Sequence, residues 1–245
     1  MHARSRQSSA LALFSLFALL ACQREQAKPV EQTAQTAVPE HAPVADKKAA
    51  APAALPSPAE LAKAAPDFTL SDTDGKSYAL SELRGKTVVL EWFNPDCPFI
   101  KFAHGKGPLV DMAAKVQSAN LVWLSINSSA PGKQGHGRER NAEARMEYKM
   151  SNPVLLDESG AVGRAYGAQK TPHVFVIDAR GVLVYRGGVD NAPMGVPDAE
   201  RPRPEGSKEG DLVPYLTNAL ADLAANRQIA LADTPAYGCS VKYKE

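Results

Sequence analysis

A single cysteine, Cys97, stands where redox chemistry could take place. It follows residues 87–93, an apolar segment that reads as a buried strand, and it directly precedes Pro98, which suits the first position of a helix. The start of a helix favours a negative charge and lowers the pKa of a thiol. We therefore expect a reactive cysteine at Cys97, with the amides of Phe99 and Ile100 facing the sulfur. Lys101 would favour the thiolate and Asp96 would oppose it, so the sequence leaves the direction of the net pKa shift open. A buried, inert cysteine is the alternative.

A second thiol, Cys239, lies far along the chain in a tail at residues 226–245. Gly238 precedes it, and we expect residues 233–235 to be a flexible approach that lets the tail fold back over Cys97. Two cysteines in an exported protein are more often paired than not, because that compartment is oxidising. Cys239 could therefore resolve an intermediate at Cys97, form a static disulfide with it, or stay a free thiol.

The first 21 residues have the pattern of an export signal. Two arginines precede an apolar run at residues 10–21 that is short for a membrane span. A small residue followed by Cys22 resembles a lipobox, in which the cysteine becomes the lipid-bearing N-terminus. We expect residues 1–21 to be removed and Cys22 to be lipidated. The protein would then be a periplasm-facing lipoprotein of the cell envelope, with Gln23 favouring the outer membrane; a soluble secreted protein is the alternative.

The remaining composition divides the chain into a tether and one folded domain. Residues 22–64 are rich in Ala, Pro, Glu, Gln and Lys, with almost no large apolar side chains, so we expect a disordered tether. The folded domain is expected over residues 65–225. The formal net charge of the 245 residues is +1, which gives no global field for attracting nucleic acid.

Strand-like and helix-like patterns alternate within residues 65–225, which predicts an α/β layer with a largely parallel central sheet. The last two expected strands form a hairpin around a tight turn at Gly181. Strands are expected near residues 68–70, 87–93, 121–126, 154–156, 173–178 and 182–186, and helices near residues 98–117, 138–150, 162–166 and 211–225.

Short motifs in this region carry a family resemblance. They are Pro66-Asp67-Phe68-Thr69-Leu70, Asp74-Gly75-Lys76, Leu83-Arg84-Gly85-Lys86, Val88-Val89-Leu90, the Cys97 junction, and Thr171-Pro172-His173-Val174-Phe175-Val176-Ile177-Asp178 with Gly181. In this order and spacing they resemble the redoxin branch of the thioredoxin superfamily, which includes alkyl-hydroperoxide-reductase-like peroxiredoxins and membrane-tethered thiol-disulfide oxidoreductases. The resemblance covers about residues 66–223. It implies a thioredoxin-like α/β fold with a mixed sheet of four to five strands flanked by helices.

The site at Cys97 departs from both kinds of relative. In thioredoxins a second cysteine stands three residues after the attacking one, and here that position is Ile100. In peroxiredoxins a threonine stands three residues before the reactive cysteine, and here that position is Asn94. Cys97 therefore resembles the attacking cysteine of a thioredoxin more than a peroxidatic one, and Cys239 is the candidate for resolving it.

The resemblance also implies roles for residues near Cys97. Glu91 matches a buried carboxylate that moves protons during disulfide exchange, although it could instead point to solvent or pair with a lysine. Thr171 and Pro172 match the loop that holds a cis-proline opposite the reactive cysteine and presents backbone groups to a substrate. Trp92, a core or near-site aromatic, and Pro98 complete the candidate substrate-binding set.

These features favour a cell-envelope thiol-disulfide oxidoreductase or peroxiredoxin-like antioxidant protein acting through Cys97. Its substrates would be protein thiols and disulfides or a hydroperoxide, with an external thiol as reductant. A non-catalytic binding module of the same fold is the alternative. A copper chaperone is a weaker one, because His104, His136 and His173 show no tight ligand spacing. We expect no metal and no other cofactor.

Overall fold

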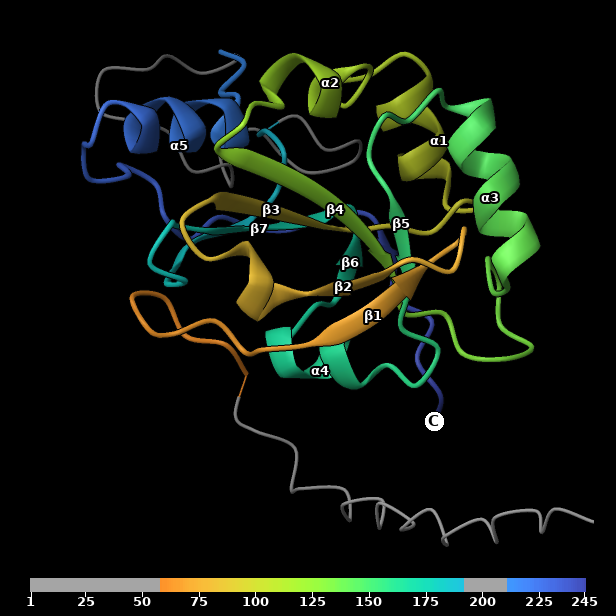
Figure 1. Cartoon of the computed structure of the whole chain (residues 1–245). Helices are drawn as coiled ribbons and strands as arrows, with labels where there is room; N and C mark the ends of the chain where they lie inside the picture. The colour runs from red at the N-terminus through yellow and green to blue at the C-terminus, as the bar shows by residue number, and fades with distance from the viewer. Residues whose placement is uncertain (1–57, 192–210) are drawn as a thin grey trace, which may run out of the picture. The chain divides into compact units, whose positions relative to one another are not determined.

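The computed structural model describes residues 58–191 and 211–245 (Figure 1). The expected signal peptide, Cys22 and the part of the tether before residue 58 lie outside the described residues.

The folded region begins earlier than residue 65. Ala59 is buried, and its amide donates a hydrogen bond to the carbonyl of Ala165 at 2.8 Å. The amide of Leu183 donates to the carbonyl of Lys63 at 2.9 Å. Residues 58–64, expected in the tether, therefore cover the edge of the sheet, which protects backbone groups that would otherwise be open to another strand.

Seven strands of the described region form one mixed sheet in the order β2-β1-β5-β4-β3-β7-β8. The pairings of β3 with β4 and of β4 with β5 are parallel, and the others are antiparallel. The predictions of a largely parallel sheet and of four to five strands were therefore wrong, because the hairpin β1–β2 joins the sheet through β5. The strands are β1 Thr69–Asp72, β2 Ser77–Ala79, β3 Thr87–Trp92, β4 Leu121–Asn127, β5 Val154–Leu156, β7 His173–Ile177 and β8 Leu183–Gly187.

Helices cover both faces of this sheet. In Figure 1, α1, α2 and α5 lie on one face and α4 on the other. The single helix expected over residues 98–117 is instead two helices, because the first one ends at Gly105. A side chain at Gly107 would clash with the backbone of the preceding helix, and Pro108 cannot continue a helix. No described helix is long and apolar enough to cross a membrane. The helices are α1 Pro98–Gly105, α2 Met112–Val116, α3 Arg138–Glu147, α4 Ala161–Tyr166 and α5 Tyr215–Ala224, with a 3-10 turn, η1, at Leu80–Leu83.

Strand β3 sends alternate side chains to the two faces, as strand geometry requires. Trp92 is fully buried on the face covered by α4, with its ring centroid 5.5 Å from that of Tyr166 and 5.1 Å from that of Phe175. Its indole nitrogen donates to Ser128 Oγ at 3.0 Å. The structure therefore corrects the placement of Trp92 in the substrate-binding set: it is a core residue with no surface to offer.

The C-terminal tail is packed onto the domain. Thr234 is buried; its amide donates to the carbonyl of Arg186 at 3.1 Å, and its hydroxyl lies 2.8 Å from the hydroxyl of Tyr185. The expectation of a flexible approach at residues 233–235 was wrong, because these contacts fasten the tail to β8.

The end of the tail forms a short strand of its own. Strand β9, Cys239–Ser240, pairs antiparallel with β6, Lys170–Thr171, in a separate two-stranded sheet. In this register Cys239 is opposite Thr171. We call residues 237–243 the strap. The strap brings the second thiol of the described region to the first.

Candidate redox site

Cys97 lies at the start of α1, as the sequence predicts. It is the N-cap residue, with extended backbone angles, and its carbonyl accepts from the amide of Lys101 at 2.9 Å. The preceding turn is fixed by Asn94, whose carbonyl accepts from the Cys97 amide at 3.1 Å and whose side-chain oxygen accepts from the Asp96 amide at 2.9 Å. Cys97 itself is fully buried in this structure.

The surroundings of Cys97 favour its thiolate. Burial alone raises the pKa of the thiol, but hydrogen bonding from the side chains of Cys239 and Thr171 and the nearby amide of Ile100 outweigh it and lower the pKa below the usual value. One contact acts the other way: the sulfur lies 3.2 Å from the carbonyl oxygen of Thr171, which accepts a bond from the protonated thiol. The net pKa is lowered, because the side chains of Cys239 and Thr171 and the backbone amides of Ile100 and Cys239 all act in that direction.

Cys239 has the opposite tendency. Burial and the adjacent Cys97 sulfur raise the pKa of its thiol to about 11, with Lys242 and the amide of Phe99 acting weakly against this. Cys239 therefore keeps its proton and donates to Cys97. Both cysteines are free thiols here, and the amides expected to face one sulfur are divided between two: Ile100 faces Cys97 and Phe99 faces Cys239.

The predicted loop residues meet at this pair. The Thr171–Pro172 peptide bond is cis, as expected, and both residues are buried. Pro98 is exposed at the first position of α1. The backbone of Thr171 does not face open solvent, because Cys239 of the strap pairs with it. The groups expected to receive a substrate are therefore already paired with the chain's own tail.

Glu91 is buried, but its partner is not a lysine. His104 Nε2 lies 2.6 Å from Glu91 Oε1, while Trp123 Nε1 and Ser125 Oγ donate to Oε2 at 3.1 Å and 3.0 Å. The ring of His104 in turn stacks on Tyr148 with centroids 5.8 Å apart. Both carboxylate oxygens of Glu91 thus have hydrogen-bonding partners within the protein, and Cys97 is not one of these partners.

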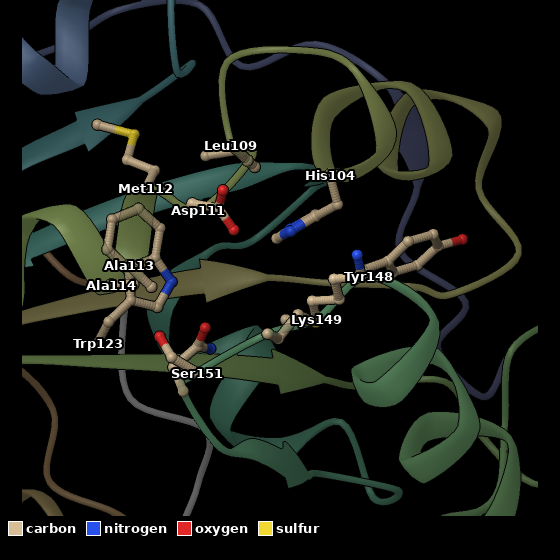
Figure 2. Close-up of a pocket in the computed structure, with 12 residues that line it drawn as sticks. His104, Leu109, Asp111, Met112, Ala113, Ala114, Trp123, Tyr148, Lys149 and Ser151 are labelled. Atoms are coloured by element: carbon tan, nitrogen blue, oxygen red, sulfur yellow. The ribbon is translucent and has the colours of Figure 1, made fainter. Parts of the chain in front are cut away.

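A small pocket of about 10 Å³ lies beside this network (Figure 2). His104 from α1, Trp123 from β4 and Tyr148 after α3 line it, and His104 points into it. The pocket therefore borders two of the partners of Glu91, His104 and Trp123.

The three histidines considered for copper are held apart by different partners. His104 is paired with Glu91, and His136 Nε2 lies 3.1 Å from a carboxylate oxygen of Glu158. Burial lowers the pKa of His173 to about 4, with a smaller contribution from the positive charge of Arg186. Among residues 58–191 and 211–245, no group of three or more His, Cys, Asp or Glu side chains could hold a metal ion.

Sequence reasoning missed the structural roles of three residues of this region, although it had considered His104 as a metal ligand. His104 follows Cys97 by seven residues, two helical turns, so the helical period could have placed it on the inward face of α1. Tyr237 and Tyr243 flank Cys239, and their hydroxyls donate to Asp190 Oδ1 at 2.9 Å and to a backbone carbonyl, that of Ala168, at 2.8 Å. Two tyrosines so close to the tail cysteine were a signal that the tail packs.

The thiolate at Cys97 should depend on its neighbour. Because a lowered pKa makes the thiolate dominant at lower pH, the rate of Cys97 alkylation by iodoacetamide should reach its plateau below the pH typical of a free thiol. Cys239→Ala removes the main side-chain donor and should move the midpoint to higher pH, whereas Cys239→Ser retains a donor and should move it less. Peptide mass spectrometry reads Cys97 alone. Equal midpoints in all three proteins would contradict this assignment.

Glu91 should tolerate an isosteric amide but not an apolar residue. Glu91→Leu leaves the buried donors on Trp123 and Ser125 without an acceptor, and we expect it to lower the free energy of unfolding by about 3 kcal/mol or more. Glu91→Gln can satisfy both donors and should cost less than about 1.5 kcal/mol. Urea unfolding measures both. Equal losses would show that the network does not depend on an acceptor at residue 91.

Comparison with known proteins supports the same chemistry. A thiol-disulfide oxidoreductase, ResA, of Geobacillus thermodenitrificans is 29% identical over 119 residues, which are 48% of this chain and 63% of the relative. Peroxiredoxin Q of rice is 24% identical over 133 residues, 50% of this chain and 56% of the relative. The chain thus spans less than two thirds of the length of these relatives. The names of both relatives describe redox proteins.

Solved structures match over a longer stretch. A hypothetical protein of Sinorhizobium meliloti is 26% identical with a TM-score of 0.63, covering 76% of this chain and 95% of its own. An uncharacterised conserved protein of Geobacillus kaustophilus is 27% identical with the same TM-score, covering 76% and 93%. A family model described as Redoxin matches residues 60–201. Together with the thioredoxin-like α/β architecture, this match shows that the chain belongs to the Redoxin family.

Proposed function

We propose that this protein is a thiol-disulfide oxidoreductase in which Cys97 attacks and Cys239 resolves. The observation that carries the proposal is the contact between two free thiols whose pKa values are driven apart, that of Cys97 downwards and that of Cys239 upwards. The thiolate is the nucleophile in disulfide exchange, so the pair has a defined order of attack.

The first step makes a mixed disulfide. The Cys97 thiolate forms a bond to one sulfur of the substrate, the substrate S–S bond breaks, and the second substrate sulfur leaves as a thiolate. Cys97 no longer carries a negative charge, so its contribution to the raised pKa of Cys239 is lost, while the contribution of burial remains. Cys239 can then release its proton, which the leaving thiolate or solvent takes up.

The second step closes the internal pair. The Cys239 thiolate attacks Cys97 Sγ, the mixed disulfide breaks, and the remaining substrate sulfur departs as a thiol after protonation. The substrate disulfide has then gained two electrons and two protons; the Cys97–Cys239 pair has supplied both electrons and the proton of Cys239, and solvent has supplied the second proton. An external dithiol reductant returns the pair to its reduced state.

Peroxide reduction has less support from the site. The side-chain nitrogen of Asn94, Nδ2, donates to Ser129 Oγ at 3.4 Å and to the carbonyl of Gln134 at 3.1 Å, and Oδ1 accepts from the Asp96 amide. The side chain at this position is therefore engaged in fixing the turn before Cys97 and has no donor left for a peroxide oxygen.

The activity should separate into two steps by mutation. Cys97→Ser should abolish turnover of a disulfide substrate with a thiol reductant, because the attacking sulfur is lost. Cys239→Ser should allow one attack and then accumulate a mixed disulfide at Cys97, with steady-state turnover reduced by about tenfold or more. Steady-state assays measure the turnover, and intact-mass spectrometry measures the mixed disulfide.

Hydroperoxide is the comparison substrate in the same assays. Unchanged disulfide turnover in Cys97→Ser would contradict the proposal. Turnover with hydroperoxide but not with any disulfide would replace it with a peroxidase function.

We also propose that the domain is tethered to the cell envelope through Cys22. The support is the sequence pattern of residues 1–22 and the apolar-poor segment that follows it. A lipid-linked thiol oxidoreductase outside the cytoplasm would meet disulfides, which persist in oxidising compartments.

Cys22→Ser should release the protein from membranes. Radiolabelled palmitate should be incorporated into the full chain and not into this variant, and the variant should move to the soluble fraction while keeping its disulfide turnover. Equal labelling of both proteins would contradict lipidation at Cys22.

A further inference from the structure

We propose that the strap selects the substrate: it restricts Cys97 to low-molecular-weight disulfides and keeps out disulfides carried by extended polypeptides. The inference rests on the proposed function, since it names the substrate class of that site. Its starting point is that the strand edge next to Pro172 is closed by residues of this chain.

The closed edge is the backbone of β6. Lys170 pairs with Ser240 and Thr171 with Cys239 in an antiparallel register. An extended peptide that docks by adding a strand needs these same backbone donors and acceptors. The strap and such a peptide therefore compete for one set of hydrogen bonds.

The strap is held on both sides of this pairing. Before it, the hydroxyl of Tyr237 donates to Asp190 Oδ1 at 2.9 Å. After it, the amide of Val241 donates to the carbonyl of Gln169 at 3.1 Å. Further on, the carbonyl of Lys242 accepts from the amide of Ala130 at 2.9 Å, and Tyr243 donates to the carbonyl of Ala168 and lies 4.8 Å under the guanidinium of Arg164.

Two kinds of substrate would require different openings of this structure. A small disulfide needs Cys239 to move aside far enough to expose the sulfur of Cys97, and Cys239 is already only half buried. A polypeptide that pairs with β6 needs the whole of β9 to leave, together with the anchors next to it. Local openings that break fewer contacts are populated more often, so the small substrate is favoured.

Gly238 provides a way to loosen the strap without removing a sulfur. Its φ is +115°, and a Cβ added there would lie 2.1 Å from the carbonyl oxygen of Thr171. Gly238→Ala should therefore push the strap away from β6. Gly85→Ala is the matched control, because Gly85 also has a left-handed φ, +83°, but nothing lies within 4 Å of the added Cβ.

The experiment compares two probes with the same leaving group. All proteins are full chains carrying Cys239→Ser, so that the adduct at Cys97 accumulates. One probe is the symmetrical disulfide of mercaptoethanol, and the other is an extended synthetic peptide whose single cysteine carries a mercaptoethanol disulfide. In both reactions the Cys97 thiolate forms the new S–S bond and a thiolate leaves. Intact-mass spectrometry gives the rate constant for each probe.

We expect Gly238→Ala to raise the ratio of the peptide rate constant to the small-disulfide rate constant by about tenfold, and Gly85→Ala to leave it unchanged. Tyr243→Phe, which removes one anchor, should raise the ratio by a smaller factor and decides the matter if Gly238→Ala does not fold. An unchanged ratio in the folded strap variants, with a measurable small-disulfide rate, would overturn the inference and leave the proposed function standing. No reaction with either probe would overturn both.

Discussion

The site depends on the antiparallel pairing between β6 and β9. This pairing is only two residues long on each side, yet it sets Cys239 opposite Thr171 and against the sulfur of Cys97. A strand pair of this length would not be stable by itself. It persists because Thr234 fastens the tail to β8 before the strap and Tyr243 fastens it to the carbonyl of Ala168 after it. The contact between the two thiols is therefore a product of tertiary packing along the whole tail.

The Glu91 carboxylate and the two thiols have different surroundings. Glu91 is satisfied by His104, Trp123 and Ser125, and these contacts join β3, β4 and α1 beneath the helix that carries Cys97. At the thiol pair, in contrast, the surroundings lower the pKa of Cys97 and raise the pKa of Cys239. The role of Glu91 as a proton carrier stays a prediction, because the contacts of its carboxylate are with the core and the pocket of Figure 2.

Local patterns in the sequence were enough to predict much of this architecture. The apolar run before Cys97 is β3, Pro98 begins α1, and the hairpin after Pro172 is β7 and β8. Residues whose position depends on packing were not predictable in this way. Trp92 faces the α4 side of the sheet, and alternation along β3 could not say which face is nearer the site. The two-residue strand β9 has no periodic signal at all, so the order of the tail had to come from the structure.

Disulfide mapping of the oxidised protein tests the central claim most directly. The reduced full chain is treated with a small excess of disulfide oxidant, the remaining thiols are blocked, and the digest is read by mass spectrometry without reduction. The account predicts that the peptides containing Cys97 and Cys239 appear linked, with the loss of two hydrogens, in monomeric protein. Recovery of Cys97 in a mixed disulfide or an intermolecular bond while Cys239 remains a free, blocked thiol would contradict it.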